Sequence, residues 1–262
     1  MPLNAAAIAA WQAGPAVPVS LFPTLPSTSG YAKDYAAHHQ TTAPHAFLAE
    51  RQTAGYGKRG RSFFSPADSG IYLSLLVPAT AVAPLTPGLL TTGAAVTVVN
   101  VLQRFFPLTV FHVKWVNDIL VDHKKVGGIL VEETAGGVVI GIGLNLFTAQ
   151  FPPALQLKAG AVTDRAVDRN IVVAGLLDAL AAFVPAYHTG GFLPEYRALA
   201  SMIGQPVTVA VGNQTLRGTA TAIDALGALV LTLADGTQRV LTAGEVTRVI
   251  LPVSLYEDGA AV

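Results

Sequence analysis

Residues Val126–Leu146 read VGGILVEETAGGVVIGIGLNL, and this stretch decides the fold class. Two apolar, β-branched runs, Val126–Glu132 and Val138–Leu146, predict strands. Ala135–Gly137 separates them by so few residues that the two strands must form a hairpin. Because strands joined by a tight hairpin pair antiparallel, a doubly wound parallel sheet is not the expected architecture.

The rest of the chain adds helices and a second region of short strands. Further strands are predicted at Phe47–Arg51, Ile71–Val77 and Val110–Trp115, and helices at Asn4–Gln12, Ser27–His38, Leu89–Phe105, Ile171–Tyr187 and Leu193–Ser201. From Ile203 the chain shows alternating runs at Val207–Val211, Leu216–Ile223, Leu229–Leu233 and Val240–Leu241, with turn residues between them. The expected fold is therefore α+β, a mixed sheet with helices over residues 1–202, then a small β-barrel over 203–262.

Composition limits the function classes. Of 262 residues, 52% are hydrophobic and 12% charged, and sixteen Lys and Arg balance sixteen Asp and Glu. A general nucleic-acid or membrane-surface binder would carry excess positive charge, so DNA and membrane partners are not expected. The absence of cysteine excludes disulfides and a cysteine nucleophile, and is compatible with the cytoplasm.

Two features of the chain bear on export and membranes. The first basic residue is Lys33, so no charged segment precedes an apolar core as in a secretory signal. No charge occurs between Asp68 and Arg104, but prolines and threonines divide that interval. A buried strand followed by a core helix is the expected structure there, rather than a membrane span.

The segment Arg51–Arg61 carries four cations and three glycines in eleven residues. Glycines allow the backbone to approach an anion, and cations neutralise its charge, so this pattern suits a phosphate. On charge alone, a solvated basic turn is the commoner explanation. Gly55-x-Gly57-x-x-Gly60 also satisfies a dinucleotide-binding pattern, but no helix follows it, which argues against that reading.

A second group of polar residues is Lys114-Trp-Val-Asn117-Asp118, followed by Lys124-Lys-Val-Gly-Gly-Ile-Leu130. Lys114 closes an apolar strand, where a carboxylate or phosphate would feel its charge strongly because screening is weak. Asn117 and Asp118 could hold a metal-bound phosphate or simply start a turn. The glycine pair within the later strand indicates a bulge or a closely approaching ligand.

Two shorter patterns complete the candidates. The hydroxyls of Ser27-Thr28-Ser29 stand at a predicted helix start, where they cap the helix or contact a ligand. Gly141 and Gly143 precede Asn145 in an apolar strand, forming either a backbone wall against a ligand or a tightly packed sheet. The six histidines show no metal-ligand spacing, so no protein metal site is expected.

Taken in order, these motifs resemble the biotin protein ligase family. Gln52–Ser65 is similar to its glycine- and arginine-rich ligand loop, Lys114–Leu130 to its Lys-Trp-Pro-Asn-Asp segment and following strand, and Val139–Asn145 to its Ile-Gly-x-Gly-x-Asn strand. The resemblance implies a mixed α+β catalytic domain and an SH3-like barrel. Only 26 residues precede Ser27, too few for the DNA-binding domain of bifunctional members, so a monofunctional ligase is expected.

The resemblance implies a two-step reaction with ATP, Mg²⁺ held mainly by the ATP phosphates, and biotin as substrate. Biotinyl-5'-AMP forms first, and biotin then passes to a lysine on the biotin carboxyl carrier domain of acetyl-CoA or pyruvate carboxylase. Lys114 is the expected catalytic residue. Expected biotin-binding residues are Ser27, Thr28, Ser29, Gln52, Gly55, Tyr56, Gly57, Lys58, Lys114, Gly128, Gly141 and Gly143; expected ATP- or phosphate-binding residues are Lys58, Arg59, Arg61, Phe63, Asn117 and Asn145. Members often form homodimers.

Four positions depart from the family pattern. Tyr56 and Lys58 stand where members usually have Arg, Ser29 where Asn is commoner, and Val116 where Pro is commoner. Tyrosine brings no charge, and lysine lacks the bidentate fork of arginine, so weaker retention of the adenylate is expected unless Arg59 compensates. Two alternatives stay open: a lipoate–protein ligase, which shares the chemistry, and a non-catalytic protein that senses biotin.

Overall fold

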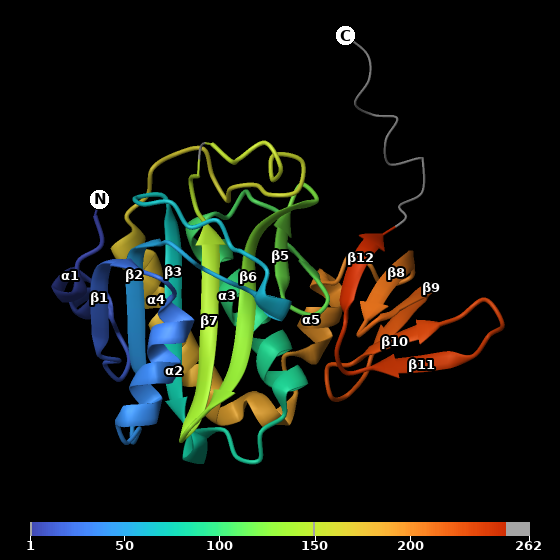
Figure 1. Cartoon of the computed structure of the whole chain (residues 1–262), viewed down its shortest axis with the longest axis horizontal. Coiled ribbons are helices and arrows are strands. Elements are labelled where there is room, and N and C mark those ends of the chain that lie inside the picture. Colours follow the sequence, from blue (N-terminus) through green and yellow to red (C-terminus); the bar gives the residue numbers. More distant parts are fainter. Residues whose placement is uncertain (1, 149, 250–262) are drawn as a thin grey trace, which may run out of the picture.

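The computed structural model describes residues 2–148 and 150–249, which form two β-sheets with helices packed on the larger one (Figure 1). The helices are α1 (Ala5–Trp11), α2 (Thr28–His38), α3 (Pro87–Phe105), α4 (Arg169–Phe183) and α5 (Leu193–Leu199), with 3-10 turns η1 (Lys58–Gly60), η2 (Ala79–Ala81) and η3 (Val184–Thr189). The large sheet contains β1 (Val19–Leu25), β2 (His45–Gln52), β3 (Gly70–Pro78), β4 (His112–Lys114), β5 (Asp118–Val121), β6 (Lys124–Thr134) and β7 (Gly137–Asn145). The second sheet contains β8 (Pro206–Val211), β9 (Gln214–Ile223), β10 (Leu229–Thr232), β11 (Gln238–Leu241) and β12 (Glu245–Val249).

The predicted hairpin lies in the middle of the large sheet. Its strand order is β1-β2-β3-β7-β6-β5-β4, and β6 pairs antiparallel with β7 from Gly127↔Leu144 to Thr134↔Gly137. Gly136 turns the chain with φ of 83°, in the left-handed region that favours glycine. Every residue of β3 is buried in the middle of the sheet. The predicted α+β class is confirmed.

The edges of the sheet differ from the sequence-based prediction. β1 was not predicted, and it pairs parallel with β2, from Val19↔Ala46 to Leu25↔Gln52. Its sequence contains Pro23, which an edge strand tolerates but which weakens any strand signal. At the other edge, the strand predicted at Val110–Trp115 is limited to His112–Lys114, and β5 follows it as a further strand.

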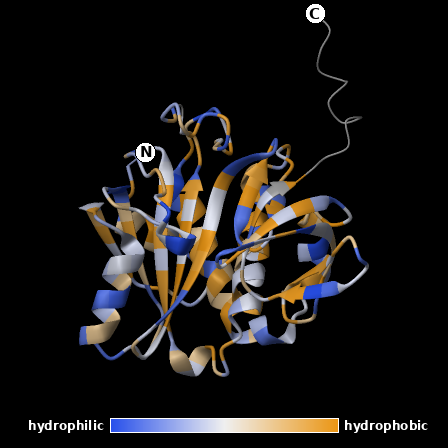
Figure 2. Cartoon of the chain, turned by 45° about the vertical axis from the view of Figure 1, so that its right-hand side comes forward, coloured by the Kyte–Doolittle hydropathy of each residue, from blue (hydrophilic) through white to orange (hydrophobic). Residues whose placement is uncertain are grey.

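Helices bury the two faces of the large sheet unequally. On the front face in Figure 1, α2 packs on Phe47, Leu76 and Val139 through the small side chains of Ala32 and Ala36. On the other face, α3 and α4 cover the main core. Figure 2 shows that most of the strand surface between these layers is hydrophobic. The front face therefore stays partly uncovered beyond the N-terminal end of α2.

The run Arg169–Thr189, formed by α4 and η3, has the length and apolar composition of a membrane-spanning helix. A core helix of a globular protein passes the same test, and Leu176, Leu177 and Leu180 of α4 are fully buried against the rest of the core. These buried leucines contribute to the apolar character of the run as core residues.

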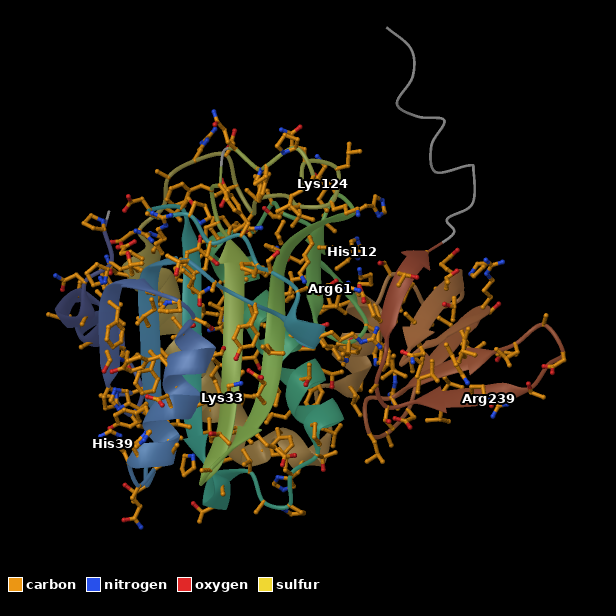
Figure 3. The ribbon with its side chains drawn as sticks, in the orientation of Figure 1. Lys33, His39, Arg61, His112, Lys124 and Arg239 are labelled. Carbon is orange, nitrogen blue, oxygen red and sulfur yellow. The ribbon has the colours of Figure 1, made fainter. Side chains whose placement is uncertain are left out.

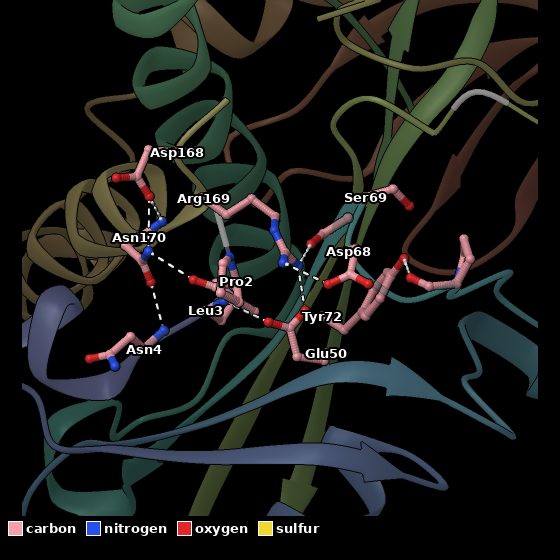
Figure 4. A network of polar contacts seen from close by, with 12 residues as sticks. Pro2, Leu3, Asn4, Glu50, Asp68, Ser69, Tyr72, Asp168, Arg169 and Asn170 are labelled. Carbon is pink, nitrogen blue, oxygen red and sulfur yellow. Dashed lines mark hydrogen bonds and ion pairs between the residues drawn. The ribbon is translucent and has the colours of Figure 1, made fainter. Parts of the chain in front are cut away.

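A buried arginine ties α4 to the large sheet (Figure 4). Arg169 is fully buried and pairs with the carboxylate of Glu50 in β2 at 2.8 Å, with a longer contact of 3.7 Å to Asp68. The same guanidinium donates to the carbonyl oxygen of Gly70 at 3.2 Å, and the backbone N–H of Leu3 donates to Glu50 at 2.6 Å. This network fixes the start of β3, where the loop that follows β2 rejoins the sheet.

The second sheet is antiparallel throughout, in the order β11-β10-β9-β8-β12. Among the described residues β11 and β12 pair on one side only, so the barrel that the family resemblance implies is an open one. Trp115 Nε1 donates to the carbonyl oxygen of Gly227 at 3.0 Å, and Arg197 Nε to that of Ile223 at 2.9 Å, which joins the two sheets. The boundary predicted after Met202 stays a prediction, and residues 250–262 of the predicted second domain lie outside the described residues.

We expect Arg169→Ala to lower the free energy of unfolding by about 3–5 kcal/mol, because it leaves the Glu50 carboxylate without its buried partner. Urea denaturation followed by circular dichroism measures the change. Arg165→Ala is the matched control, since its contact with Asp164 at 3.9 Å is exposed, and it should cost less than about 0.5 kcal/mol. Equal effects of the two substitutions would contradict the structural role of Arg169.

Candidate functional site

The strand register creates a hollow on the front face of the large sheet. Ser74 of β3 lies opposite Gly141 of β7, and Gly141 lies opposite Leu130 of β6. One two-residue step along the sheet, Gly143 of β7 lies opposite Gly128 of β6. Directly opposed residues share a face, and apart from Leu130 these carry small side chains or none. A pocket with an empty volume of about 420 Å³, its open mouth included, lies above them.

The pocket collects residues from α2, from the end of β2 and the loop after it, from β3, from the turn between β4 and β5, and from β6 and β7. Its lining comprises Thr28, Ser29, Gln52, Tyr56, Gly57, Phe63, Leu73, Asn117, Lys125, Gly128, Ile129, Leu130, Gly141, Ile142 and Gly143. Ten of these residues were predicted from the sequence as ligand contacts. The other five are four apolar residues and Lys125. Figure 1 shows why these parts meet: the segment after β2 crosses in front of β7 and β6.

The glycines of the site are required by close approach. A Cβ atom at Gly143 would lie 2.7 Å from the Phe63 ring, and one at Gly141 would lie 2.6 Å from Ser29 Oγ. A Cβ at Gly55 would meet the amide of Gln52 at 2.7 Å. These distances are too short for any real side chain. The glycines therefore let the ligand loop and the α2 N-terminus lie directly on the sheet.

A buried carboxylate gathers the two lysines of the site. Asp118 at the start of β5 contacts Lys114 Nζ at 2.9 Å and Lys125 Nζ at 2.5 Å. Burial by itself would raise the pKa of Asp118, but Lys125 and Lys114 outweigh it and hold this pKa below its usual value. A charged Asp118 thus fixes both ammonium groups, and only Lys125 of the two lines the pocket.

Sequence reasoning selected Lys114 and missed Lys125. Lys114 pairs with Asp118 in the β4–β5 register, whereas Lys125 reaches the same carboxylate from β6. A β-bulge between Ile119 and Leu120 shifts the β5–β6 register in between. The available signal was a lysine two residues before the Gly127-Gly128 pair, but the direction of its side chain depends on that bulge.

Asn117 is held beside these lysines by two hydrogen bonds to β6. Its side-chain Nδ2 donates to the carbonyl oxygen of Ile129 at 2.8 Å, and its own carbonyl accepts the Ile129 N–H at 2.9 Å. The preceding Trp115–Val116 peptide bond is cis, at the position where the family usually has proline. Asn117 lines the pocket, and its expected role near the nucleotide stays a prediction.

The cations of the ligand loop point to the second sheet. Lys58 Nζ donates to the carbonyl oxygen of Gly244 at 3.2 Å, and Arg59 donates to that of Ala210 at 3.1 Å. Arg61 forms an ion pair with Glu245, and Figure 3 places it between the two sheets. Burial, then the neighbouring Arg59, lowers the pKa of Lys58. The structure thus places these three cations at the junction between the two sheets, at the rim of the site and outside the pocket lining.

The remaining predicted residues support the pocket from outside. Ser27 caps α2, accepting the Gly30 N–H at 3.2 Å, which is the structural explanation that the sequence left open. Asn145 is buried at the end of β7 and donates to the carbonyl oxygen of Gly160 at 3.2 Å. Neither residue lines the pocket, so their roles in binding biotin and ATP stay predictions.

Tyr56 closes one side of the pocket by contacts with charged residues. Its hydroxyl donates to Glu132 at 3.0 Å, and the other carboxylate oxygen of Glu132 contacts Lys33 at 2.8 Å. Lys33 Nζ also lies 5.3 Å from the centre of the Tyr56 ring. Tyr56 thus anchors the ligand loop to β6 by its hydrogen bond to Glu132, and to α2 by the contact of its ring with Lys33.

Several relatives are similar in sequence to most of this chain. Residues 21–146 match the Biotin/lipoate A/B protein ligase family, and residues 202–248 match the Biotin protein ligase C terminal domain. The Bifunctional ligase/repressor BirA of Escherichia coli (strain K12) is 30% identical, over 87% of this chain and 73% of that protein. The Biotin--[acetyl-CoA-carboxylase] ligase of Mycobacterium tuberculosis is 33% identical, over 76% of this chain and 77% of that protein. The chain belongs to the biotin protein ligase family.

Solved structures agree with this membership at the level of the fold. A biotin protein ligase from Aquifex aeolicus, solved in complex with biotin and ATP, superposes with a TM-score of 0.73 at 22% identity. The match covers 87% of this chain and 96% of that one. A biotin protein ligase from Leishmania major, in complex with biotinyl-5-AMP, gives a TM-score of 0.62 at 20% identity over 87% of this chain.

We expect Tyr56→Phe to loosen the ligand loop, because it removes the hydrogen bond to Glu132 and keeps the ring. Loss of one such bond, worth about 1 kcal/mol, should speed tryptic cleavage after Lys58, Arg59 or Arg61 by about fivefold. Time-resolved mass spectrometry of the digest measures the rate. Glu133→Gln is the control at the neighbouring position and should leave cleavage unchanged. A Tyr56→Phe rate equal to that of the unmodified chain would contradict the anchor.

Proposed function

We propose that this chain is an ATP-dependent biotin protein ligase, which forms biotinyl-5'-AMP and passes biotin to a lysine of a carrier domain. The observation that carries the proposal is one pocket with hydroxyl and amide groups from Thr28, Ser29 and Gln52, and with Lys125 among its lining. Biotin needs polar groups for its ring, which is a cyclic urea, and a cation for its other end, which is a carboxylate. The apolar side chain of Leu130 shares the pocket face with Gly141 and suits the hydrocarbon between them.

In the first step, a carboxylate oxygen of biotin attacks the α-phosphorus of ATP, and the bond to pyrophosphate breaks. In the second step, the lysine amine of the carrier attacks the acyl carbon, an amide forms, and AMP leaves with the electron pair of the broken bond. Both reactants of the first step are anions, so fixed cations are the main catalytic device. Lys125 is the proposed contact to the biotin carboxylate. Lys114 is the proposed second cation of the site, held by its ion pair with Asp118.

The proposed phosphate ligands are Lys58, Arg59 and Arg61, together with Asn117. The three cations bond to carbonyl oxygens and Glu245 of the second sheet, and phosphate oxygens would replace these acceptors when ATP binds. Mg²⁺ would enter with the ATP phosphates. Both oxygens of Asp118 already contact lysines, and the described residues contain no group of three or more His, Cys, Asp or Glu that could hold a metal.

The second domain and the relatives support biotin over lipoate. The family model over residues 21–146 covers both kinds of ligase, but the match over residues 202–248 is specific to biotin protein ligases. The proposed acceptor is the biotin carboxyl carrier domain of acetyl-CoA or pyruvate carboxylase. We propose that the protein acts in the cytoplasm and binds neither DNA nor a membrane. The homodimer stays a prediction.

Pyrophosphate release with each acid, followed by transfer of label to a purified carrier domain, tests the function. We expect biotin to stimulate release and label to reach the carrier lysine, with no stimulation by lipoate. Stimulation by lipoate alone would assign lipoate ligation instead. Tight biotin binding without label transfer would assign a biotin-sensing protein.

We expect Lys125→Ala to slow biotin adenylation by about 100- to 1000-fold, as for the loss of one fixed electrostatic contact to a developing charge. Lys114→Ala should slow it less, because Lys114 acts through Asp118 and does not line the pocket. Lys124→Ala is the matched control: this lysine, labelled in Figure 3, directly precedes Lys125 but is exposed and does not line the pocket, so the adenylation rate should stay unchanged. Near-normal adenylation by Lys125→Ala would remove that residue from the mechanism.

A further inference from the structure

A chain of buried hydroxyl groups runs beneath the pocket. Ser29 Oγ lies 2.9 Å from Ser74 Oγ, Ser74 Oγ lies 2.8 Å from Thr28 Oγ1, and Thr28 Oγ1 lies 3.2 Å from Gln52 Oε1. Ser74 comes from β3, is fully buried, and does not line the pocket itself. It is the link between the two hydroxyls of α2 that do line the pocket.

The amide of Gln52 sets the direction of this chain. Its Oε1 accepts the backbone N–H of Thr28 at 2.8 Å, and its Nε2 donates to Ser65 Oγ at 3.0 Å. Ser65 in turn donates to the carbonyl oxygen of Phe63 at 3.0 Å. The reversed amide would place a donor against the Thr28 N–H, so its orientation follows from the network.

With the amide fixed, each hydroxyl has one place for its single proton. The Thr28 hydroxyl donates to Gln52 Oε1, and the Ser74 hydroxyl therefore donates to Thr28. Ser74 has no second proton, so Ser29 is the donor in the Ser29–Ser74 contact. Hydrogen bonds that run in one direction polarise each other, which favours this arrangement over a mixed one.

The consequence appears at the pocket end of the chain. The hydroxyl proton of Ser29 is donated to Ser74, which lies beneath the pocket. Toward the pocket, Ser29 Oγ therefore presents only its lone pairs, and acts as an acceptor. Gly141 leaves the space for this oxygen, since a Cβ there would lie 2.6 Å from it. A buried acceptor gains most from a ligand that brings a donor and loses from one that brings another acceptor.

We propose that Ser74 is a positioning residue that makes Ser29 a hydrogen-bond acceptor for one ring N–H of biotin. The inference deepens the proposed function and rests on it. A cyclic urea carries two N–H groups, whereas the dithiolane ring of lipoate carries none. The oriented chain thus supplies part of the selection between the two acids.

Isothermal titration calorimetry on the full-length protein tests the direction of the hydrogen bonds between these hydroxyls. The probes are biotin and the two cyclic carbamates in which one ring N–H or the other is replaced by oxygen. In the unmodified protein, the isomer whose oxygen faces Ser29 should bind about 10- to 100-fold more weakly than biotin. We call this ratio the carbamate penalty.

Ser74→Ala removes the acceptor for the Ser29 proton, which then can donate to the ring oxygen of the carbamate. We expect biotin to bind more weakly and the carbamate penalty to fall below about fivefold. A merely structural role of Ser74 would weaken both ligands equally and leave the penalty unchanged. Thr92→Ala is the matched control, since it removes an equally buried hydroxyl of α3 and should keep the penalty.

Thr28→Val interrupts the same chain one step further on and should also lower the penalty, which covers the case in which Ser74→Ala does not fold. An unchanged penalty in Ser74→Ala or Thr28→Val, or no penalty for either isomer in the unmodified protein, would overturn the inference alone. No binding of biotin by the unmodified protein would overturn the proposed function as well.

Discussion

The site depends on the register between β3, β7 and β6. This register places Ser74 beside Gly141 and Gly143 beside Gly128, on the face that α2 leaves uncovered. A sheet of larger side chains would present a closed apolar surface there. Because a shift of one residue would turn every side chain to the other face, the buried core behind the sheet also fixes the pocket in front of it. Packing and binding are set by the same pairing.

Charge is used locally in this protein. The chain is neutral overall, yet Asp118 gathers Lys114 and Lys125 beside the pocket. The carboxylate is buried and stays charged because the two lysines lower its pKa. A cation held in this way costs little reorganisation when an anion arrives, which is the basis of electrostatic preorganisation. The balanced net charge is therefore no obstacle to a site for two anionic reactants.

The ligand loop connects three parts of the molecule. Gly57 and Phe63 line the pocket, Tyr56 contacts Glu132 on β6, and Arg61 pairs with Glu245 of the second sheet. The loop was predicted as one ligand-binding unit, and the structure divides its residues between the pocket and the junction of the sheets. Tyr56 stands at a position where the family usually has Arg. It contacts Glu132 through its hydroxyl and Lys33 through its ring, without a charge of its own.

The sequence by itself determined the central hairpin, the mixed α+β class, the family, and most of the pocket lining. These rest on local signals: alternation, turn glycines and motifs whose residues are close together in the chain. Only the tertiary structure decided that Lys125 lines the pocket, that Ser74 links Thr28 to Ser29, and that β1 pairs parallel with β2. Each of these depends on a register, a bulge or a contact between distant strands, and no local pattern of residues specifies such pairings.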